Sequence, residues 1–173
     1  SHGLDLSNEA GLARLAETLR ASTEIDWEAR PLLAEAALPG EAQPVRNPGD
    51  RRDVVGMVEE ASGEAARTAV ALAARHASEW AAVSPGDRAA CLDRAADAME
   101  GRIETLLGLI MREAGKSAPN AIAEVREAVD FLRYYAEQTR RTLGPGHKPL
   151  GPVVYISPWN FPLAIFTGQR SEE

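Results

Sequence analysis

The run of residues 153–156 near the end of the chain is the sequence feature that most constrains the fold. Four apolar residues in succession, Val-Val-Tyr-Ile, are typical of a strand that is buried on both faces in a parallel sheet. Pro162 suits the first turn of a helix, so we expect a new helix to begin near Phe161. A parallel strand needs neighbouring strands, and we find no other of this kind. The sequence therefore predicts an α/β fold of which this chain holds one C-terminal parallel-type strand.

Most of the chain before that run has the periodicity of amphipathic helices. We expect a first helix over residues 1–22, with Ser7 as its N-cap. Ser62 and Ser84 are expected to cap two further helices, and Gly115 to end a third. The last long helix is expected over 120–138. The predicted inward-facing residues are Ala66, Val70, Ala73, Ala77 and Trp80, then Leu92, Ala95, Ala96 and Met99, then Ile103, Leu106, Leu107, Ile110 and Met111, and then Ile122, Val125, Val129 and Leu132.

A β-hairpin is predicted in the N-terminal part of the chain. Pro48 presets φ at the second position of a turn and Gly49 tolerates a positive φ at the third, and residues 54–58 read as the returning strand. Residues 23–43 show no clear period and are interpreted as a connector. The predicted organisation is thus an N-terminal helix and connector over 1–43, followed by a mostly helical region over 44–173.

Composition excludes several classes of function. The formal charge of −7 and the pI of about 5.1 disfavour nucleic acid and anionic membrane surfaces as partners. No apolar stretch approaches the roughly 18 residues of a membrane span. The single cysteine permits no intramolecular disulfide, which favours a reducing compartment such as the cytoplasm. Cys91 lies within a predicted helix and is expected to be a buried, inert thiol. The three histidines share no ligand spacing, so no metal site is predicted.

Asn160 is the residue whose position points most directly to chemistry. It lies just before the predicted helix at Pro162, near the positive end of that helix. A side-chain amide there is able to stabilise an oxyanion that develops on a bound carbonyl. The alternative is that the asparagine satisfies the backbone of its own turn. Position alone leaves both interpretations open.

Residues 154–163, Val-Tyr-Ile-Ser-Pro-Trp-Asn-Phe-Pro-Leu, closely resemble the motif that opens the NAD-binding domain in the aldehyde dehydrogenase superfamily. Other segments resemble the family in the same order, namely the hairpin around Asn47, the turn at 113–117 and the helix at 124–136. Within the superfamily, residues 157–169 are most similar to the L-glutamate γ-semialdehyde dehydrogenase branch found in proline utilization A enzymes of bacterial proline catabolism.

The resemblance implies a Rossmann-like NAD-binding domain and an NAD-dependent oxidation of a small-molecule aldehyde. It implies that Asn160 is the oxyanion-hole amide and that Phe161 lines the aldehyde channel. Glu124 would meet the substrate's ammonium group, with a solvated helix glutamate as the alternative. The residues implied to run beside the adenosine ribose of NAD are Ile156, Ser157, Pro158 and Trp159. A homo-oligomer remains open for the full-length enzyme.

Departures from the family pattern are equally informative. The family's nucleophilic cysteine, general-base glutamate and glycine turn for the pyrophosphate have no counterpart in this sequence, and Cys91 does not occupy the nucleophile's position. We therefore expect an N-terminal piece of such an enzyme that is inactive alone. The alternatives are a non-catalytic helical interaction module built on the same scaffold and a piece of another aldehyde dehydrogenase branch.

Overall fold

The computed structural model describes residues 1–33, 40–144 and 146–171. Parts of two predicted segments, the connector at 23–43 and the helix-breaking stretch at 144–146, lie outside the described residues. The elements are α1 (Glu9–Ala21), η1 (Ser22–Glu24), β1 (Trp27–Ala29), β2 (Ala42–Arg46), β3 (Val54–Glu59), α2 (Gly63–Ala82), α3 (Pro85–Glu100), α4 (Ile103–Ala114), α5 (Ala118–Thr142) and α6 (Ala164–Ser171). The predicted fold class, mostly helical with an N-terminal hairpin, is confirmed.

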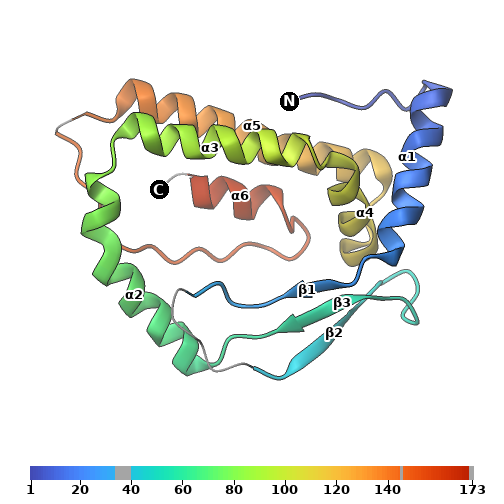
Figure 1. Cartoon of the computed structure of the whole chain (residues 1–173), viewed down its shortest axis with the longest axis horizontal. Helices are drawn as coiled ribbons and strands as arrows, with labels where there is room; N and C mark the ends of the chain where they lie inside the picture. The colour runs from blue at the N-terminus through green and yellow to red at the C-terminus, as the bar shows by residue number, and fades with distance from the viewer. Residues whose placement is uncertain (34–39, 145, 172–173) are drawn as a thin grey trace.

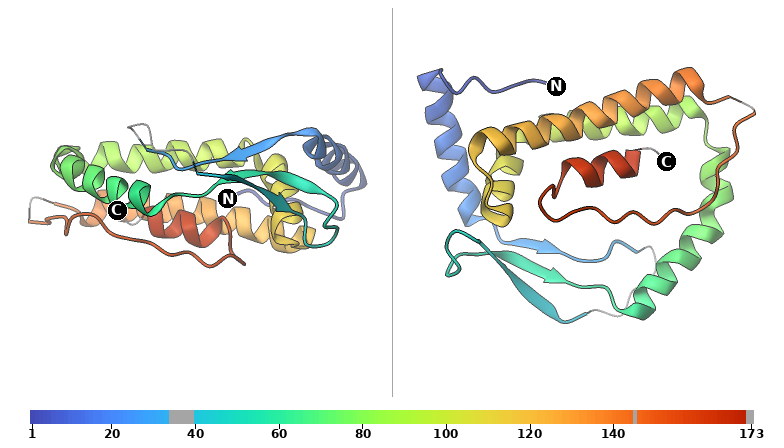
Figure 2. Two further views of the ribbon diagram at one scale, coloured as in Figure 1. Left: turned by 90° about the horizontal axis from the view of Figure 1, so that it is seen from below. Right: turned by 180° about the vertical axis from the view of Figure 1, so that it is seen from behind.

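The elements form an open frame around the C-terminal segment (Figure 1). Helices α3 and α5 run side by side along one edge, and the three-stranded sheet lies along the opposite edge. Helix α2 joins the sheet to α3 on one side, while α1 and α4 close the other side. Helix α6 lies inside this frame and packs against α5, as both views in Figure 2 show. The segment that carries Asn160 is therefore held next to α5.

The core is built where α5 meets its neighbouring helices. One cluster joins α1, α4 and the start of α5, and a second joins α3 to the middle of α5. Ala96 of α3 at this second junction is fully buried, as are Ala128 and Ala136 of α5, and such small side chains allow helices to approach closely. The buried members of the two clusters are Leu15, Leu107, Ile110, Ala121, Ile122 and Val125, and then Ala96, Val129 and Leu132. The predicted inward faces of α4 and α5 are thus confirmed.

The sheet has the order β1-β3-β2. The antiparallel β2–β3 pair is the predicted hairpin, with Val45 opposite Gly56. The turn predicted at Pro48 and Gly49 is wrong, because Gly49 has no positive φ and the hydrogen-bonded turn lies at Asp50–Asp53, where the Asp53 N–H donates to the Asp50 carbonyl oxygen at 2.9 Å. Strand β1 pairs with β3 in parallel, so the interpretation of residues 23–43 as a plain connector is wrong at this point. A three-residue strand carries too little periodicity to be recognised from sequence. Gly56 permits the close pairing, because a Cβ there would lie 2.3 Å from the Trp27 carbonyl oxygen.

Arg112 of α4 ties the hairpin to the helices. Its Nη2 donates to Asp53 Oδ1 at 2.6 Å and its Nε donates to Asp53 Oδ2 at 3.1 Å. Asn47 Nδ2 donates to the same carboxylate at 3.0 Å. The hydrogen bonds from Arg112 and then Asn47 lower the pKa of Asp53 from 3.8 to about 2.

The N-cap of α1 lies one residue later than predicted, and the helix starts at Glu9, so the expectation of a helix from residue 1 is wrong. Asn8 is the N-cap, and its Oδ1 accepts the Gly11 N–H at 3.0 Å. The predicted cap, Ser7, instead donates its hydroxyl to Asp5 Oδ1 at 2.6 Å. Both residue types suit an N-cap, so the local pattern does not distinguish them. The caps predicted at Ser62 and Ser84 and the stop at Gly115, where φ is +64°, are confirmed.

The predicted buried stripe of α2 is wrong. Val70 is 55% exposed and Trp80 is 46% exposed, and Ala65 is the buried residue of this helix. The reason is the place of α2 in the frame, where it links the sheet to α3 and has no extensive contact with another described helix or strand. Periodicity indicates an apolar face, but it does not supply the surface that would cover it.

Residues 153–156 form no strand with any part of the chain that the structure describes. Val154 is 75% exposed and Ile156 is 85% exposed, and the three-stranded sheet lies elsewhere in the frame. The predicted parallel-type strand therefore has no neighbour to pair with. Turns occupy most of residues 159–163, so α6 begins at Ala164 and not near Phe161.

Candidate functional site

Asn160 lies in a tight turn before α6. The Phe161 N–H donates to the Pro158 carbonyl oxygen at 3.3 Å, which closes the turn around Asn160. Asn160 is exposed, and its side chain makes no hydrogen bond with any described residue. The alternative in which this amide satisfies the backbone of its own turn is thus not what the structure shows. Its donor has no hydrogen-bond partner among the described residues, which leaves it able to bind a ligand.

Glu124 of α5 holds the start of α6. The residue is only 2% exposed, and its Oε1 accepts the backbone N–H groups of Leu163 and Ala164, each at 3.0 Å. The first N–H groups of a helix have no partner within that helix, so the carboxylate caps α6 from a neighbouring helix. The helix dipole also favours a negative charge at this position. The alternative of a solvated helix glutamate is therefore wrong.

Lys116 completes this buried arrangement. Its ammonium forms an ion pair with Glu124 Oε2, and Nζ lies 4.3 Å from the centroid of the Phe161 ring, within the range of a cation–π contact. Gly115 places Lys116 by ending α4 in the left-handed conformation, after which Ser117 starts α5. One ammonium thus contacts both the capping carboxylate and the residue next to Asn160.

Sequence reasoning missed the roles of Lys116 and of the Glu124 cap. The available signal was the spacing of Lys116 and Glu124 on either side of a helix start, eight residues apart. That signal does not reveal α6, because Ala164 lies 40 residues beyond Glu124. The cap is a contact between segments that are distant in the sequence.

The residues implied for the cofactor, 156–159, form an exposed stretch before Asn160. Ile156 is 85% exposed and Trp159 is 81% exposed, whereas Ser157 is half-buried. Phe161 is 39% exposed, with its ring against Lys116. The stretch therefore offers exposed apolar surface directly before the turn that carries Asn160.

Cys91 is exposed, so the prediction of a buried thiol is wrong. It lies on α3, and Arg94 Nη2 is 3.0 Å from its sulfur. Within the described residues, no group of three or more His, Cys, Asp or Glu side chains is arranged to hold a metal ion. None of the described helices has the length and apolar character needed to cross a membrane.

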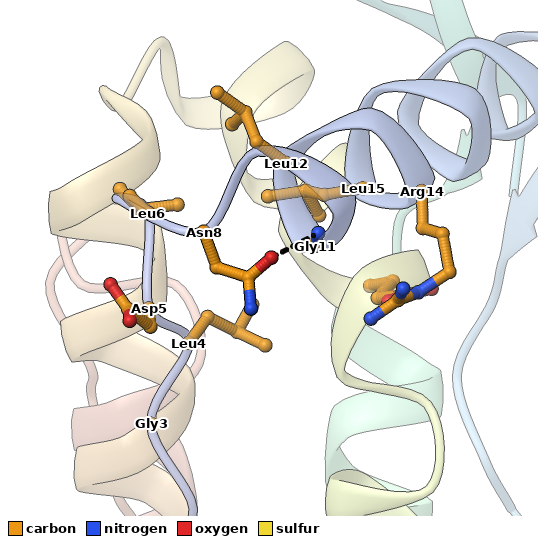
Figure 3. Close-up of a pocket in the computed structure, with 10 residues that line it drawn as sticks. Gly3, Leu4, Asp5, Leu6, Asn8, Gly11, Leu12, Arg14 and Leu15 are labelled. Atoms are coloured by element: carbon orange, nitrogen blue, oxygen red, sulfur yellow. Dashed lines mark hydrogen bonds between the residues drawn. The ribbon is translucent and has the colours of Figure 1, made fainter.

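Two hollows on the surface lie apart from these residues. The first, of about 150 Å³, lies between the N-terminal arm, α1 and Glu104 of α4 (Figure 3). It closes around the Asn8 cap, whose hydrogen bond to Gly11 is drawn there. The second, of about 580 Å³, is a hollow along α5 beside Phe131 and Tyr134. Neither includes Asn160, Glu124 or Lys116.

Comparison with known proteins identifies relatives across almost the whole chain. The model of the aldehyde dehydrogenase family matches residues 35–171. The bifunctional protein PutA of Rhizobium meliloti is 61% identical over 169 residues, which are 98% of this chain and 14% of that protein. The 1-pyrroline-5-carboxylate dehydrogenase 2 of Bacillus subtilis is 40% identical over 70% of this chain and 26% of its own length.

Solved structures agree with the sequence comparison. The 1-pyrroline-5-carboxylate dehydrogenase from Thermus, solved with bound NAD, superposes with a TM-score of 0.85 at 29% identity. That match covers 98% of this chain and 36% of the other. The chain therefore spans about one seventh of the Rhizobium protein and about a third of the Thermus enzyme.

Proposed function

The chain belongs to the aldehyde dehydrogenase family, and from that membership we propose that it forms one part of an NAD-dependent enzyme that oxidises L-glutamate γ-semialdehyde to L-glutamate in proline catabolism. The names of its relatives support this substrate. 1-Pyrroline-5-carboxylate is the cyclic imine that forms when the amine of this semialdehyde condenses with its own carbonyl group. An enzyme named for the imine therefore acts on the same carbon skeleton.

Asn160 is the proposed oxyanion donor. When a nucleophile adds to an aldehyde, negative charge develops on the carbonyl oxygen, and a preorganised N–H donor stabilises it. The observation that supports this role is that the Asn160 amide is exposed and has no hydrogen-bond partner among the described residues. The helix that follows its turn is capped by the buried Glu124. An amide whose N–H groups were already hydrogen-bonded within its own turn would not be able to donate to the substrate.

Residues 156–159 are the proposed wall of the cofactor groove. Their fit to NAD rests on the exposed apolar surface of Ile156 and Trp159, against which a nucleoside is able to lie. When bound, NAD would accept a hydride from the substrate. The work of this chain's residues is to line the groove and to exclude water from it. Phe161 is proposed to line the aldehyde channel next to Asn160.

The nucleophilic cysteine and the general base are proposed to come from parts of the longer enzyme that this chain does not include. Glu124 as a ligand of the substrate's ammonium group stays a prediction, and both of its carboxylate oxygens already have partners. The division of the chain at residue 43, the cytoplasmic location and a homo-oligomeric full-length enzyme also stay proposals.

A second candidate function is a non-catalytic interaction module. The observation that favours it is the row of exposed apolar side chains near the C-terminus, including Val154, Ile156 and Trp159, which would bind a partner. Sedimentation of the isolated chain distinguishes the two. A stable, well-folded monomer favours the module, whereas association or partial unfolding favours a part of a larger enzyme.

A chimera tests the proposed function. We would replace the 169-residue matching segment of the Rhizobium meliloti protein with this chain and measure aldehyde-dependent reduction of NAD. Asn160→Ala is expected to lower kcat by about 10²–10³-fold, the typical cost of removing one oxyanion donor. Asn120→Ala, at an exposed position on α5, is the matched control and is expected to leave kcat unchanged.

Two results would contradict the proposal. One is an Asn160→Ala chimera that retains the full kcat of the unmodified chimera. The other is clear aldehyde oxidation by the isolated chain, which is expected to have none. A folded chimera that carries this chain without substitutions and shows no activity would likewise count against it.

A further inference from the structure

We propose that Glu124 is a positioning residue for Asn160, acting through the start of α6 and through Lys116. The inference rests on the proposed role of Asn160 as oxyanion donor, since positioning matters only if the amide is used. Glu124 forms no hydrogen bond with Asn160 in the described part of the chain, and its buried carboxylate binds the N–H groups of Leu163 and Ala164. It therefore acts on the backbone that carries the donor.

The turn is anchored at two points, both of which follow Asn160 in the chain. At the first point, the Leu163 and Ala164 N–H groups donate to Glu124 Oε1, and the Leu163 side chain packs against the core cluster of α1, α4 and α5. Nearer to Asn160, the Phe161 ring lies against the Lys116 ammonium. Asn160 is adjacent to Phe161, so both anchors lie within four residues of it.

Lys116 links the two anchors electrostatically. A buried carboxylate is stable only when it is paired and its oxygens accept hydrogen bonds. Oε1 is occupied by the two N–H groups of α6, and Oε2 is occupied by the Lys116 ammonium, which also contacts Phe161. Moving the carboxylate would therefore disturb the helix start and the aromatic contact at the same time.

The dependence of Asn160 on this scaffold follows from its own lack of support. Its side chain has no hydrogen-bond partner among the described residues, so the backbone of the turn sets where its donor points. An oxyanion donor must lie about 2.7–3.1 Å from the developing charge. A misplacement of about 1 Å is enough to cost roughly 10²-fold in rate.

Glu124→Gln separates the two anchors. The glutamine oxygen is able to accept the two N–H groups of α6, but its amide group would face the Lys116 ammonium, donor against donor. Lys116→Met removes the other partner and leaves the carboxylate in place. Glu137→Gln is the matched control, since Glu137 lies on the same helix and forms an exposed ion pair with Arg141.

The first test is hydrogen exchange in the chimera, followed by mass spectrometry. Glu124→Gln and Lys116→Met are expected to speed amide exchange in peptides that cover residues 158–166, and Glu137→Gln to leave it unchanged. This readout does not depend on activity, so it judges the positioning even if the proposed function fails. Unchanged exchange at 158–166 in both variants would overturn the inference.

The second test is a double-mutant cycle in kcat. Glu124→Gln alone is expected to lower kcat by about 10–100-fold, with a smaller change in KM, because the donor is displaced. In the Asn160→Ala background, the same substitution is expected to have no further effect, since the group it positions is gone. A merely structural role would give additive losses, and additivity would overturn the inference. If Asn160→Ala alone left kcat unchanged, the proposed function would be contradicted. The hydrogen-exchange result would still test whether Glu124 positions the turn.

Discussion

The Glu124 carboxylate accepts the backbone N–H of Ala164 at 3.0 Å, although the two residues lie 40 positions apart in the sequence. The contact joins the middle of the helical core to the last helix of the chain. It also fixes the residue that follows the candidate site's turn. The stability of this small region and the position of Asn160 are therefore expected to depend on the same buried charges.

Lys116→Met is expected to destabilise the chain more than its solvent exposure suggests. The change leaves the 2%-exposed Glu124 without its cation, and breaking a buried pair in this way costs about 3–5 kcal/mol. Urea unfolding followed by tryptophan fluorescence measures the effect. Arg141→Met, which breaks the exposed pair with Glu137, is the control, with an expected cost below about 1 kcal/mol. Equal costs for the two variants would show that the Glu124 pair is not buried as described.

Gly168→Ala is expected to loosen the packing of α6 on α5. A Cβ at this position would lie 2.9 Å from Phe131 Cδ2, which forces the ring or the helix to move. Overpacking of this kind costs about 1–3 kcal/mol, partly offset by a helix-propensity gain of about 1 kcal/mol. Thermal unfolding measures the net loss. A Cβ at Gly86 in α3 would lie 3.8 Å from Ser84 Oγ, which is an ordinary van der Waals distance. Gly86→Ala is therefore expected to be neutral or stabilising. A stabilised Gly168→Ala variant would contradict the described contact.

The Asp53–Arg112 pair is expected to stabilise the chain in a pH-dependent way. Hydrogen bonds from Arg112 and Asn47 lower the pKa of Asp53 from 3.8 to about 2 in the folded state. A lowered folded-state pKa contributes stability that is present above the unfolded value and is lost as pH falls through the folded value. The stability difference between the native chain and Asp53→Asn should therefore shrink as pH falls from about 4 to about 2. Urea midpoints at several pH values measure it, and a constant difference would rule out this role for the carboxylate.

Cys91 is expected to react with a thiol reagent in the folded chain, because its side chain is exposed on α3. One equivalent of a chromogenic disulfide should react without denaturant. Cys91→Ser in the chimera is expected to keep the full kcat, because the nucleophile is proposed to lie elsewhere in the enzyme. A loss of activity with an unchanged fold would assign the thiol a role that the proposal denies it.

The parts of the fold that could be predicted are those with local causes. Ser62, Ser84 and Gly115 begin and end helices through contacts with their near neighbours. The inward faces of α4 and α5 follow from periodicity, and the β2–β3 hairpin follows from the turn-forming residues between its two strands. Each of these features was correctly predicted from sequence.

The parts that could not be predicted depend on partners that are distant in the sequence or lie outside it. Strand β1 forms by pairing with β3, and Glu124 acts as a cap because α6 lies beside it. Residues 153–156 have the pattern of a buried strand, yet they form none among the described residues. The sequence pattern indicates which secondary structure a segment favours, whereas the neighbouring segments determine whether that structure forms. Asn160 was identified because its neighbours carry a family motif.

The most direct test of the central claim is a crystal structure of the chimera with a bound aldehyde or its analogue. The account predicts that the Asn160 Nδ2 lies about 3 Å from the carbonyl oxygen, within the range of an oxyanion donor. It also predicts that residues 153–156 pair as a strand with segments of the longer protein, while Glu124 keeps its contacts with Leu163 and Ala164. A structure in which the Asn160 side chain points away from the bound carbonyl would contradict the account.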